Sequence, residues 1–178
     1  DLDRTLIPNG QQPESPQARP YFRQFITNEK ITLAYVTGRH LELVETAILK
    51  YQLPTPNFVI ADVGSSIYYQ QGSQWHRWET WDHYLAEDWQ HQSAIAISQL
   101  LTEFTDLILQ ESEKQSLHKL SYYVDLDHTI ETLIPEIYDI LKKEKIAANL
   151  IWSIDEIAAI GLLDILPQKA NKYQAIAF

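Results

Sequence analysis

The chain has 178 residues, 45% of them hydrophobic and 21% charged, so it is long enough to bury a core as one large domain or two small ones. It contains no cysteine, which excludes disulfides, thiolate metal sites and a cysteine nucleophile. A formal net charge of -10 argues against a nucleic-acid partner, because phosphate backbones are bound mainly by lysine and arginine.

The first part of the chain predicts a parallel α/β core. Residues 31–36 form a short apolar run rich in β-formers, which indicates a buried strand. Residues 40–51 carry apolar side chains at the i, i+3, i+4, i+7 spacing of an amphipathic helix. Residues 57–61 predict a second strand, and residues 67–73 predict a further strand leading into a hairpin. A strand, a helix and a strand in succession are typical of a parallel sheet.

From about residue 82 the pattern changes to that of an inserted α+β layer. Its expected elements are a helical stretch over 82–105, a strand over 119–124, a helix over 130–145, and strands over 147–152 and 161–166. We therefore predict a first core part over 1–81, a cap over 82–166 and a returning core segment over 167–178.

Two carboxylates open the chain in the sequence Asp1-Leu2-Asp3. In an extended segment, side chains two residues apart project to the same side, so the two acids would share one site. Each carboxylate raises the pKa of the other until a cation relieves the repulsion, and such a pair can divide catalytic roles. The pair alone also fits a solvated loop.

The surrounding segments resemble the motifs of haloacid dehalogenase (HAD) phosphatases in the right order. Asp1-Leu2-Asp3-x-Thr5-Leu6 is similar to their first motif, and Ala34-Tyr35-Val36-Thr37-Gly38-Arg39 is similar to their second. Residues 57–68 look like the segment before the cap, and residues 164–175 like the segment that carries the third motif. The resemblance implies a HAD-like doubly wound, Rossmann-type parallel core with an inserted α+β cap domain.

Within that superfamily the chain most resembles the sucrose-phosphate phosphatases, through residues 35–40, 63–68, 117–123 and 165–167. It departs from their pattern at Arg4, where Asn or Gly is usual, and at Tyr173, where Gly is usual. The resemblance implies hydrolysis of a sugar phosphate, with sucrose 6-phosphate as the first candidate and glucosylglycerol phosphate close behind.

The resemblance also implies roles for four catalytic residues. Asp1 would attack phosphorus to form an aspartyl phosphate, and Asp3 would serve as acid and then base. Thr37 would hold a phosphoryl oxygen, and Lys172 would neutralise the charge of the transferring group. Thr37 could instead cap a helix, and Lys169 competes with Lys172 for its role. The expected cofactor is Mg²⁺, bound by the Asp1 carboxylate and the Asp3 main-chain carbonyl.

The expected substrate-binding residues lie around these four. They are Gly38, Arg39, His40, Ser65, Ser66, Lys119 and Tyr122. Arg39 and His40 also fit surface salt bridging, and strand alternation also permits Tyr122 to be a core residue.

The remaining expectations concern the whole protein. No apolar run approaches the roughly 20 residues needed to span a bilayer and no signal peptide is visible, so we expect a cytoplasmic monomer without a membrane partner. Sucrose-phosphate synthase is a candidate partner, and the alternative function is a non-catalytic, phosphatase-like regulatory or ligand-binding module of such a synthase. The chain ends at Phe178 within an expected helix. We therefore expect a fragment that lacks the fourth motif and is inactive alone.

Overall fold

The structure, a computed structural model, describes residues 1–8, 13–28, 31–127 and 130–178. The chain divides into two units, the first of which combines Asp1–Trp78 with Lys172–Phe178, while the second spans Glu79–Asn171. The second unit is therefore an insertion within the first. The predicted domain limits at residues 82 and 166 fall inside the second unit and stay a prediction.

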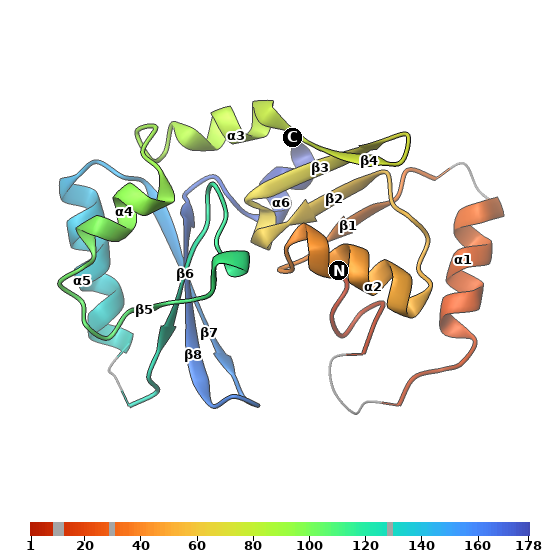
Figure 1. Cartoon of the computed structure of the whole chain (residues 1–178), viewed down its shortest axis with the longest axis horizontal. Coiled ribbons are helices and arrows are strands. Elements are labelled where there is room, and N and C mark those ends of the chain that lie inside the picture. Colours follow the sequence, from red (N-terminus) through yellow and green to blue (C-terminus); the bar gives the residue numbers. More distant parts are fainter. Residues whose placement is uncertain (9–12, 29–30, 128–129) are drawn as a thin grey trace. The chain divides into compact units, whose positions relative to one another are not determined.

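The first unit has a four-stranded sheet in the order β1-β2-β3-β4 (Figure 1). Its elements are α1 (Ala18–Asn28), β1 (Ala34–Val36), α2 (Leu41–Tyr51), β2 (Phe58–Ala61), the 3-10 turn η1 (Asp62–Gly64), β3 (Ser66–Gln71), β4 (Gln74–Arg77) and α6 (Lys172–Ala177). Strands β1 and β2 are parallel and α2 connects them, whereas β2, β3 and β4 pair antiparallel. The predicted strand–helix–strand unit and hairpin are confirmed.

The core of the first unit forms between the sheet and the helix α2. It contains Leu2, Ile7, Tyr35, Val44, Ala47, Leu53, Val59 and Ala61. Helix α2 buries Val44 and Ala47, as its apolar spacing predicts. Gln52 ends the helix in a left-handed conformation, with φ at 52°, and its N–H donates to the carbonyls of Ile48 and Leu49. Helix α1 was not predicted from the sequence.

The second unit has an antiparallel sheet in the order β5-β6-β8-β7 (Figure 1). Its elements are α3 (Glu79–Ala86), α4 (Ala94–Leu100), β5 (Ile108–Leu109), the 3-10 turn η2 (Ser112–Lys114), β6 (Leu120–Val124), α5 (Ile130–Lys143), β7 (Ala148–Asp155) and β8 (Ile160–Pro167). Helix α5 buries Leu133, Ile137 and Leu141, which are four residues apart and therefore share one helix face.

The two faces of this second sheet differ. One face packs against α4 and α5, and Leu120, Tyr122 and Val124 of β6 belong to that apolar core. Successive side chains of a strand point to opposite faces. Ser121 therefore lies on the other face, opposite Asp164 of β8 in the strand register.

The helical stretch predicted over 82–105 is not continuous. The structure has α3 and α4 there, separated by a turn in which Gln90 and His91 are left-handed, with φ at 51° and 59°. Left-handed residues cannot continue a right-handed helix, and the Ser93 side chain then caps α4 by accepting from the Ala96 N–H at 3.1 Å. In the described ranges, no helix combines the length and the apolar character that a membrane crossing requires.

Candidate active site

The first motif folds into a tight loop around a buried residue. The carbonyl of Leu2 accepts the N–H groups of Thr5, Leu6 and Ile7 at 3.2, 2.9 and 3.0 Å, and the Leu2 side chain is buried. Arg4 adopts a left-handed conformation, with φ at 57°. Because Leu2 is anchored in the core, its neighbours Asp1 and Asp3 are held at the surface of the first unit.

Lys172 lies against the first of these carboxylates. Its Nζ is 3.3 Å from Asp1 Oδ2, and the two side chains are 39% and 46% exposed. Lys172 is the first residue of α6, which packs beside η1 and β2. The fold thus brings together two residues from opposite ends of the chain, a carboxylate and a cation, as the resemblance predicts.

Arg39 lies against the second carboxylate. Its Nε donates to Asp3 Oδ2 at 2.9 Å, and its Nη2 donates to Asp3 Oδ1 at 2.6 Å. The hydrogen bonds from Arg39 are the main reason that the pKa of Asp3 is below its ordinary value, and Asp3 in turn raises the pKa of Arg39. Arg39, predicted to contact substrate, here binds Asp3.

Thr37 follows β1 at the carboxyl end of the parallel pair. It is fully buried, its N–H donates to the Ile60 carbonyl at 2.9 Å, and its Oγ1 accepts the Arg39 N–H at 3.2 Å. The carboxyl ends of parallel strands are where α/β folds place their ligands. Gly38 is exposed and His40 half-buried in the same loop.

The turn η1 holds this loop in place. The N–H of Asp62 donates to the Arg39 carbonyl at 3.0 Å, and the N–H of Val63 donates to the Thr37 carbonyl at 3.2 Å. Asp62 and Val63 are both left-handed, with φ at 51° and 62°. A left-handed β-branched residue is a genuine outlier, and such strain clusters at functional sites.

Ser65 and Ser66 follow this turn and are fully buried. Within the part of the chain that the structure describes, their Oγ atoms have no hydrogen-bond partner. Buried hydroxyls normally find one, so these two are the unsatisfied polar groups beside the site.

Lys119 and Tyr122 belong to the second unit, where both are buried. Lys119 lies on the polar side of the sheet, with its Nζ 3.7 Å from Asp164 Oδ1, an atom that also accepts the Ser121 hydroxyl at 2.5 Å. Tyr122 lies in the apolar core, and burial raises its pKa to about 12. This is the core position that strand alternation left open, and burial does not support the predicted sugar contact of Tyr122.

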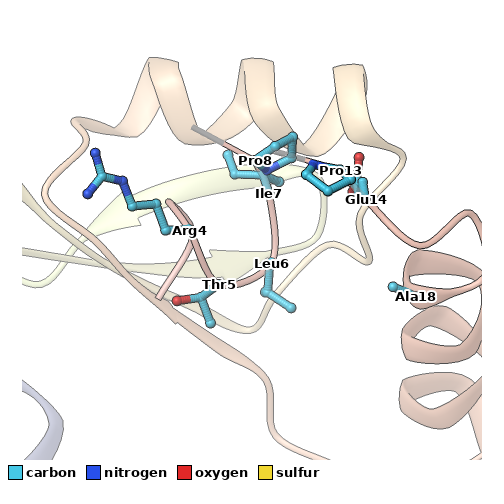
Figure 2. Close-up of a pocket in the computed structure, with 8 residues that line it drawn as sticks. All are labelled: Arg4, Thr5, Leu6, Ile7, Pro8, Pro13, Glu14 and Ala18. Atoms are coloured by element: carbon cyan, nitrogen blue, oxygen red, sulfur yellow. The ribbon is translucent and has the colours of Figure 1, made fainter. Parts of the chain in front are cut away.

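Beside the first motif is a hollow of about 170 Å³ (Figure 2). It is lined by Arg4, Thr5, Leu6, Ile7, Pro8, Pro13, Glu14 and Ala18. Figure 2 shows the Arg4 guanidinium extending away from Pro13 and Glu14. The hollow thus adjoins the loop of Asp1 and Asp3 without containing either carboxylate.

The comparison with protein families agrees with this arrangement. Residues 1–178 match the model of a family described as sucrose-6F-phosphate phosphohydrolase. The chain belongs to this family. Its fold is therefore that of the HAD-like hydrolases, as predicted.

Individual members support the assignment. The chain is 49% identical over its whole length to a protein of Nitrosococcus oceani whose name marks it as a HAD-like hydrolase, and it covers 48% of that protein. It is 27% identical to sucrose-phosphatase 1 of Nicotiana tabacum, covering all of this chain and 40% of that protein. The chain thus spans about half the length of these relatives, or less.

A solved structure gives the same result. The sucrose-phosphatase from Synechocystis sp., in complex with sucrose and phosphate, superposes with a TM-score of 0.73 at 26% identity. The superposition covers 92% of this chain and 63% of that one.

The residues of this family member fit a hard cation in part. The Asp1 carboxylate and the Asp3 carbonyl are oxygens of the kind that Mg²⁺ prefers, and Mg²⁺ usually keeps several waters. In residues 1–8, 13–28, 31–127 and 130–178 there is no group of three or more His, Cys, Asp or Glu side chains able to hold a metal. Among the described residues, the Asp1 carboxylate and the Asp3 carbonyl are the ligands expected to hold the ion, with water or phosphate as further ligands.

Sequence reasoning missed the partner of Arg39 and the role of η1. Arg39 was expected to contact substrate or to form a surface ion pair, whereas the structure pairs it with Asp3 of the first-motif loop. For η1, the sequence did not indicate that Val63, a β-branched residue, adopts a left-handed conformation.

Proposed function

We propose that the protein to which this chain belongs is a magnesium-dependent phosphomonoester hydrolase that acts on a sugar phosphate, with sucrose 6-phosphate as the first candidate. The ion pair between Asp1 and Lys172 carries this proposal. A carboxylate can act as a nucleophile toward phosphorus, and a fixed cation beside it stabilises the negative charge of the transferring group.

The proposed reaction has two steps. In the first, an Asp1 carboxylate oxygen attacks phosphorus, the bond from phosphorus to the sugar oxygen breaks, and Asp3 gives its proton to that oxygen. In the second, Asp3 takes a proton from a water molecule that attacks the phosphorus of the aspartyl phosphate at Asp1. The bond from phosphorus to the Asp1 oxygen breaks, which releases inorganic phosphate and restores both carboxyl groups to their starting forms. The sugar and phosphate are the only products.

Three further contributions come from the surroundings of the two aspartates. Lys172 would neutralise charge on the phosphoryl group and on Asp1, and the buried Thr37 would bind a phosphoryl oxygen at the end of β1. Bound Mg²⁺, held by Asp1 and the Asp3 carbonyl, would supply additional positive charge at the phosphate.

The proposed sugar specificity rests on the family match and on residues of the first unit. Gly38 and His40 would contact substrate from the loop after β1, and Ser65 and Ser66, whose hydroxyls have no hydrogen-bond partner among the described residues, would contact it from the segment after η1. The proposed ligand is a small-molecule sugar phosphate, and a sucrose-phosphate synthase is the proposed partner.

A phosphate-release assay of the full-length protein tests the proposal. The panel contains sucrose 6-phosphate, glucosylglycerol phosphate and glucose 6-phosphate, each with Mg²⁺ or with a chelator. Asp1→Asn should abolish release because it removes the nucleophile, whereas circular dichroism should stay unchanged. Asp155→Asn is the matched control, since Asp155 is an exposed residue of β7 in the other unit.

Two outcomes would reject the proposal. One is the absence of phosphate release from every member of the panel, which would favour the alternative of a non-catalytic module. The other is turnover by Asp1→Asn at the wild-type rate, which would show that the first motif does not supply the nucleophile.

A further inference from the structure

We propose that Asp88 is a positioning residue that acts on Lys172 by fixing the chain segment that leads into it. This inference rests on the proposed function. The segment, called here the return connection, comprises residues 168–171 and runs from the end of β8 in the second unit to Lys172, the first residue of α6 in the first unit. Asp88 lies in the turn after α3, within the second unit.

The Asp88 carboxylate binds the backbone of the return connection. Its Oδ2 accepts the main-chain N–H of Lys169 at 2.7 Å, and the Asp88 side chain is only 9% exposed. Hydrogen bonds from an N–H to a carboxylate are roughly twice as strong as those between neutral groups. The Asp88 backbone is fixed as well, because its N–H donates to the Leu85 carbonyl at 3.1 Å and its carbonyl accepts the Ala147 N–H at 2.8 Å. Asp88 is therefore a rigid anchor for this segment.

The anchor limits the freedom of the residues that begin α6. Directly after it, Ala170 is fully buried, and its N–H donates to the Pro167 carbonyl at 2.9 Å. Helix α6 has six residues, and a helix of this length is not stable without support from its surroundings. Lys172 occupies the first position, where helices fray. Fixing the return connection therefore restricts the backbone of Lys172.

Lys172 needs this restriction because its contact with Asp1 is weak. The two charged groups are 3.3 Å apart and both side chains are partly exposed, and ion pairs of this kind hold their partners poorly. A catalytic group that is displaced by about 1 Å can lose about 10²-fold in rate. The position of the Lys172 charge therefore depends on its backbone, and through the return connection on Asp88.

The experiment compares Asp88→Ala with Ser93→Ala in the full-length protein. Ser93 is a matched control, because its side-chain oxygen also accepts a main-chain N–H of the second unit, that of Ala96 at 3.1 Å, but caps α4 outside the return connection. A third variant, Asp88→Asn, keeps an oxygen for the Lys169 N–H and removes the charge that lies 3.5 Å from Lys169 Nζ.

We expect Asp88→Ala to lower kcat for the best sugar phosphate of the panel by about 10-fold and to change KM by less than about 3-fold. Ser93→Ala should lower the urea midpoint but change kcat by less than about 2-fold. Asp88→Asn should keep kcat within about 3-fold of the wild type, because the main-chain contact remains. In a Lys172→Met background, Asp88→Ala should lower kcat no further, since the two residues act as one unit.

Four kinetic results would overturn the inference. The first is an equal kcat for Asp88→Ala and Ser93→Ala, and the second is an undiminished effect of Asp88→Ala in the Lys172→Met background. The third is a rise in KM without a fall in kcat, which would assign Asp88 to substrate binding. The fourth is a loss for Asp88→Asn as large as for Asp88→Ala, which would assign the effect to the ion pair with the Lys169 side chain.

Hydrogen exchange tests the anchor without an activity assay. Exchange of the amides of residues 169–177 should be about 10-fold faster in Asp88→Ala than in Ser93→Ala, and equal exchange would reject the anchor. If Asp88→Ala does not fold, Asn149→Ala replaces it, because the Asn149 Nδ2 donates to the Gln168 carbonyl of the same connection at 2.8 Å. This variant should show a fall in kcat and faster exchange, each about 3-fold, and no change in either would reject the inference. If the wild-type protein hydrolyses no member of the panel, the proposed function fails, and exchange alone decides whether Asp88 fixes the start of α6.

Discussion

The two units differ in what holds their notable residues in place. In the first unit, two ion pairs hold side chains that are partly or largely exposed, namely Asp1 with Lys172 and Asp3 with Arg39. In the second unit, the polar group of Lys119, Ser121 and Asp164 is largely enclosed on a sheet whose other face packs against α4 and α5. The first arrangement allows access to a ligand, and the second stabilises a sheet.

This difference predicts opposite effects of substitution. A change at the exposed ion pairs of the first unit should alter chemistry and leave stability almost unchanged, because surface pairs contribute only about 0–1 kcal/mol. A change in the packed second unit should lower stability without touching the reacting atoms. Two lysines near the unit boundary and one glycine provide the sharpest comparisons.

The largest expected effect comes from Lys172→Met, compared with Lys169→Met. Lys172 pairs with Asp1, whereas Lys169 lies in the other unit, 3.0 Å from Glu87 and 4.3 Å from the centre of the Tyr84 ring. Removing a group that stabilises transition-state charge costs about 10²- to 10³-fold in rate. We expect that loss in kcat for Lys172→Met with the sugar phosphate, and less than about 3-fold for Lys169→Met.

Thermal unfolding and kinetics of the same two variants test this assignment. Thermal unfolding should show Lys172→Met close to the wild type. A larger fall in kcat for Lys169→Met than for Lys172→Met would assign the charge-stabilising role to Lys169. Lys169, and not Lys172, would then be the lysine of the third motif.

A smaller effect, on stability alone, is expected from Gly161→Ala. A methyl group at Gly161 of β8 would overlap the indole ring of Trp152, which packs against the core of the second unit. Overpacking of this kind costs about 1–3 kcal/mol. Urea unfolding followed by tryptophan fluorescence measures the loss. Gly161→Ala should cost less in the Trp152→Leu variant than in the wild type, because the indole ring is then absent. If the losses of the two substitutions add strictly, the ring is not the obstacle.

Much of the fold could be predicted from the sequence, because burial leaves a periodic pattern. Helix α5 is visible in the four-residue spacing of Leu133, Ile137 and Leu141, and helix α2 in its apolar face. The break between α3 and α4 could not be predicted in this way, because Gln90 and His91 are left-handed without being glycine or asparagine. Helix α1 was missed although Phe22, Phe25 and Ile26 have the i, i+3, i+4 spacing of an apolar helix face, and the structure packs Phe22 against the core of the first unit.

The candidate site could be predicted where a motif fixes both residue type and position. The pair of Asp1 and Lys172 lies together as the family resemblance implies. The partners of the motif residues were not predictable in the same way. The contact of Arg39 with Asp3 depends on how the loops after β1 and around the first motif approach each other, and hydrogen bonds from the strained η1 determine that approach.

The smallest expected effect concerns Arg4, at which the chain departs from its family. Arg4 has φ at 57°, a left-handed conformation that costs an ordinary residue roughly 1–2 kcal/mol and costs asparagine less. Its N–H donates to the Ile7 carbonyl at 2.9 Å, so the surrounding loop enforces this conformation. Arg4→Asn should therefore raise the free energy of unfolding by about 0.5–1 kcal/mol, measured by urea denaturation. Arg4→Lys keeps both the charge and the strain, so its stability should equal that of the wild type within about 0.3 kcal/mol. The opposite result would be a free energy of unfolding that Arg4→Asn does not increase and that Arg4→Lys lowers. In that case the Arg4 guanidinium makes a stabilising contact, and this contact outweighs the backbone strain at residue 4.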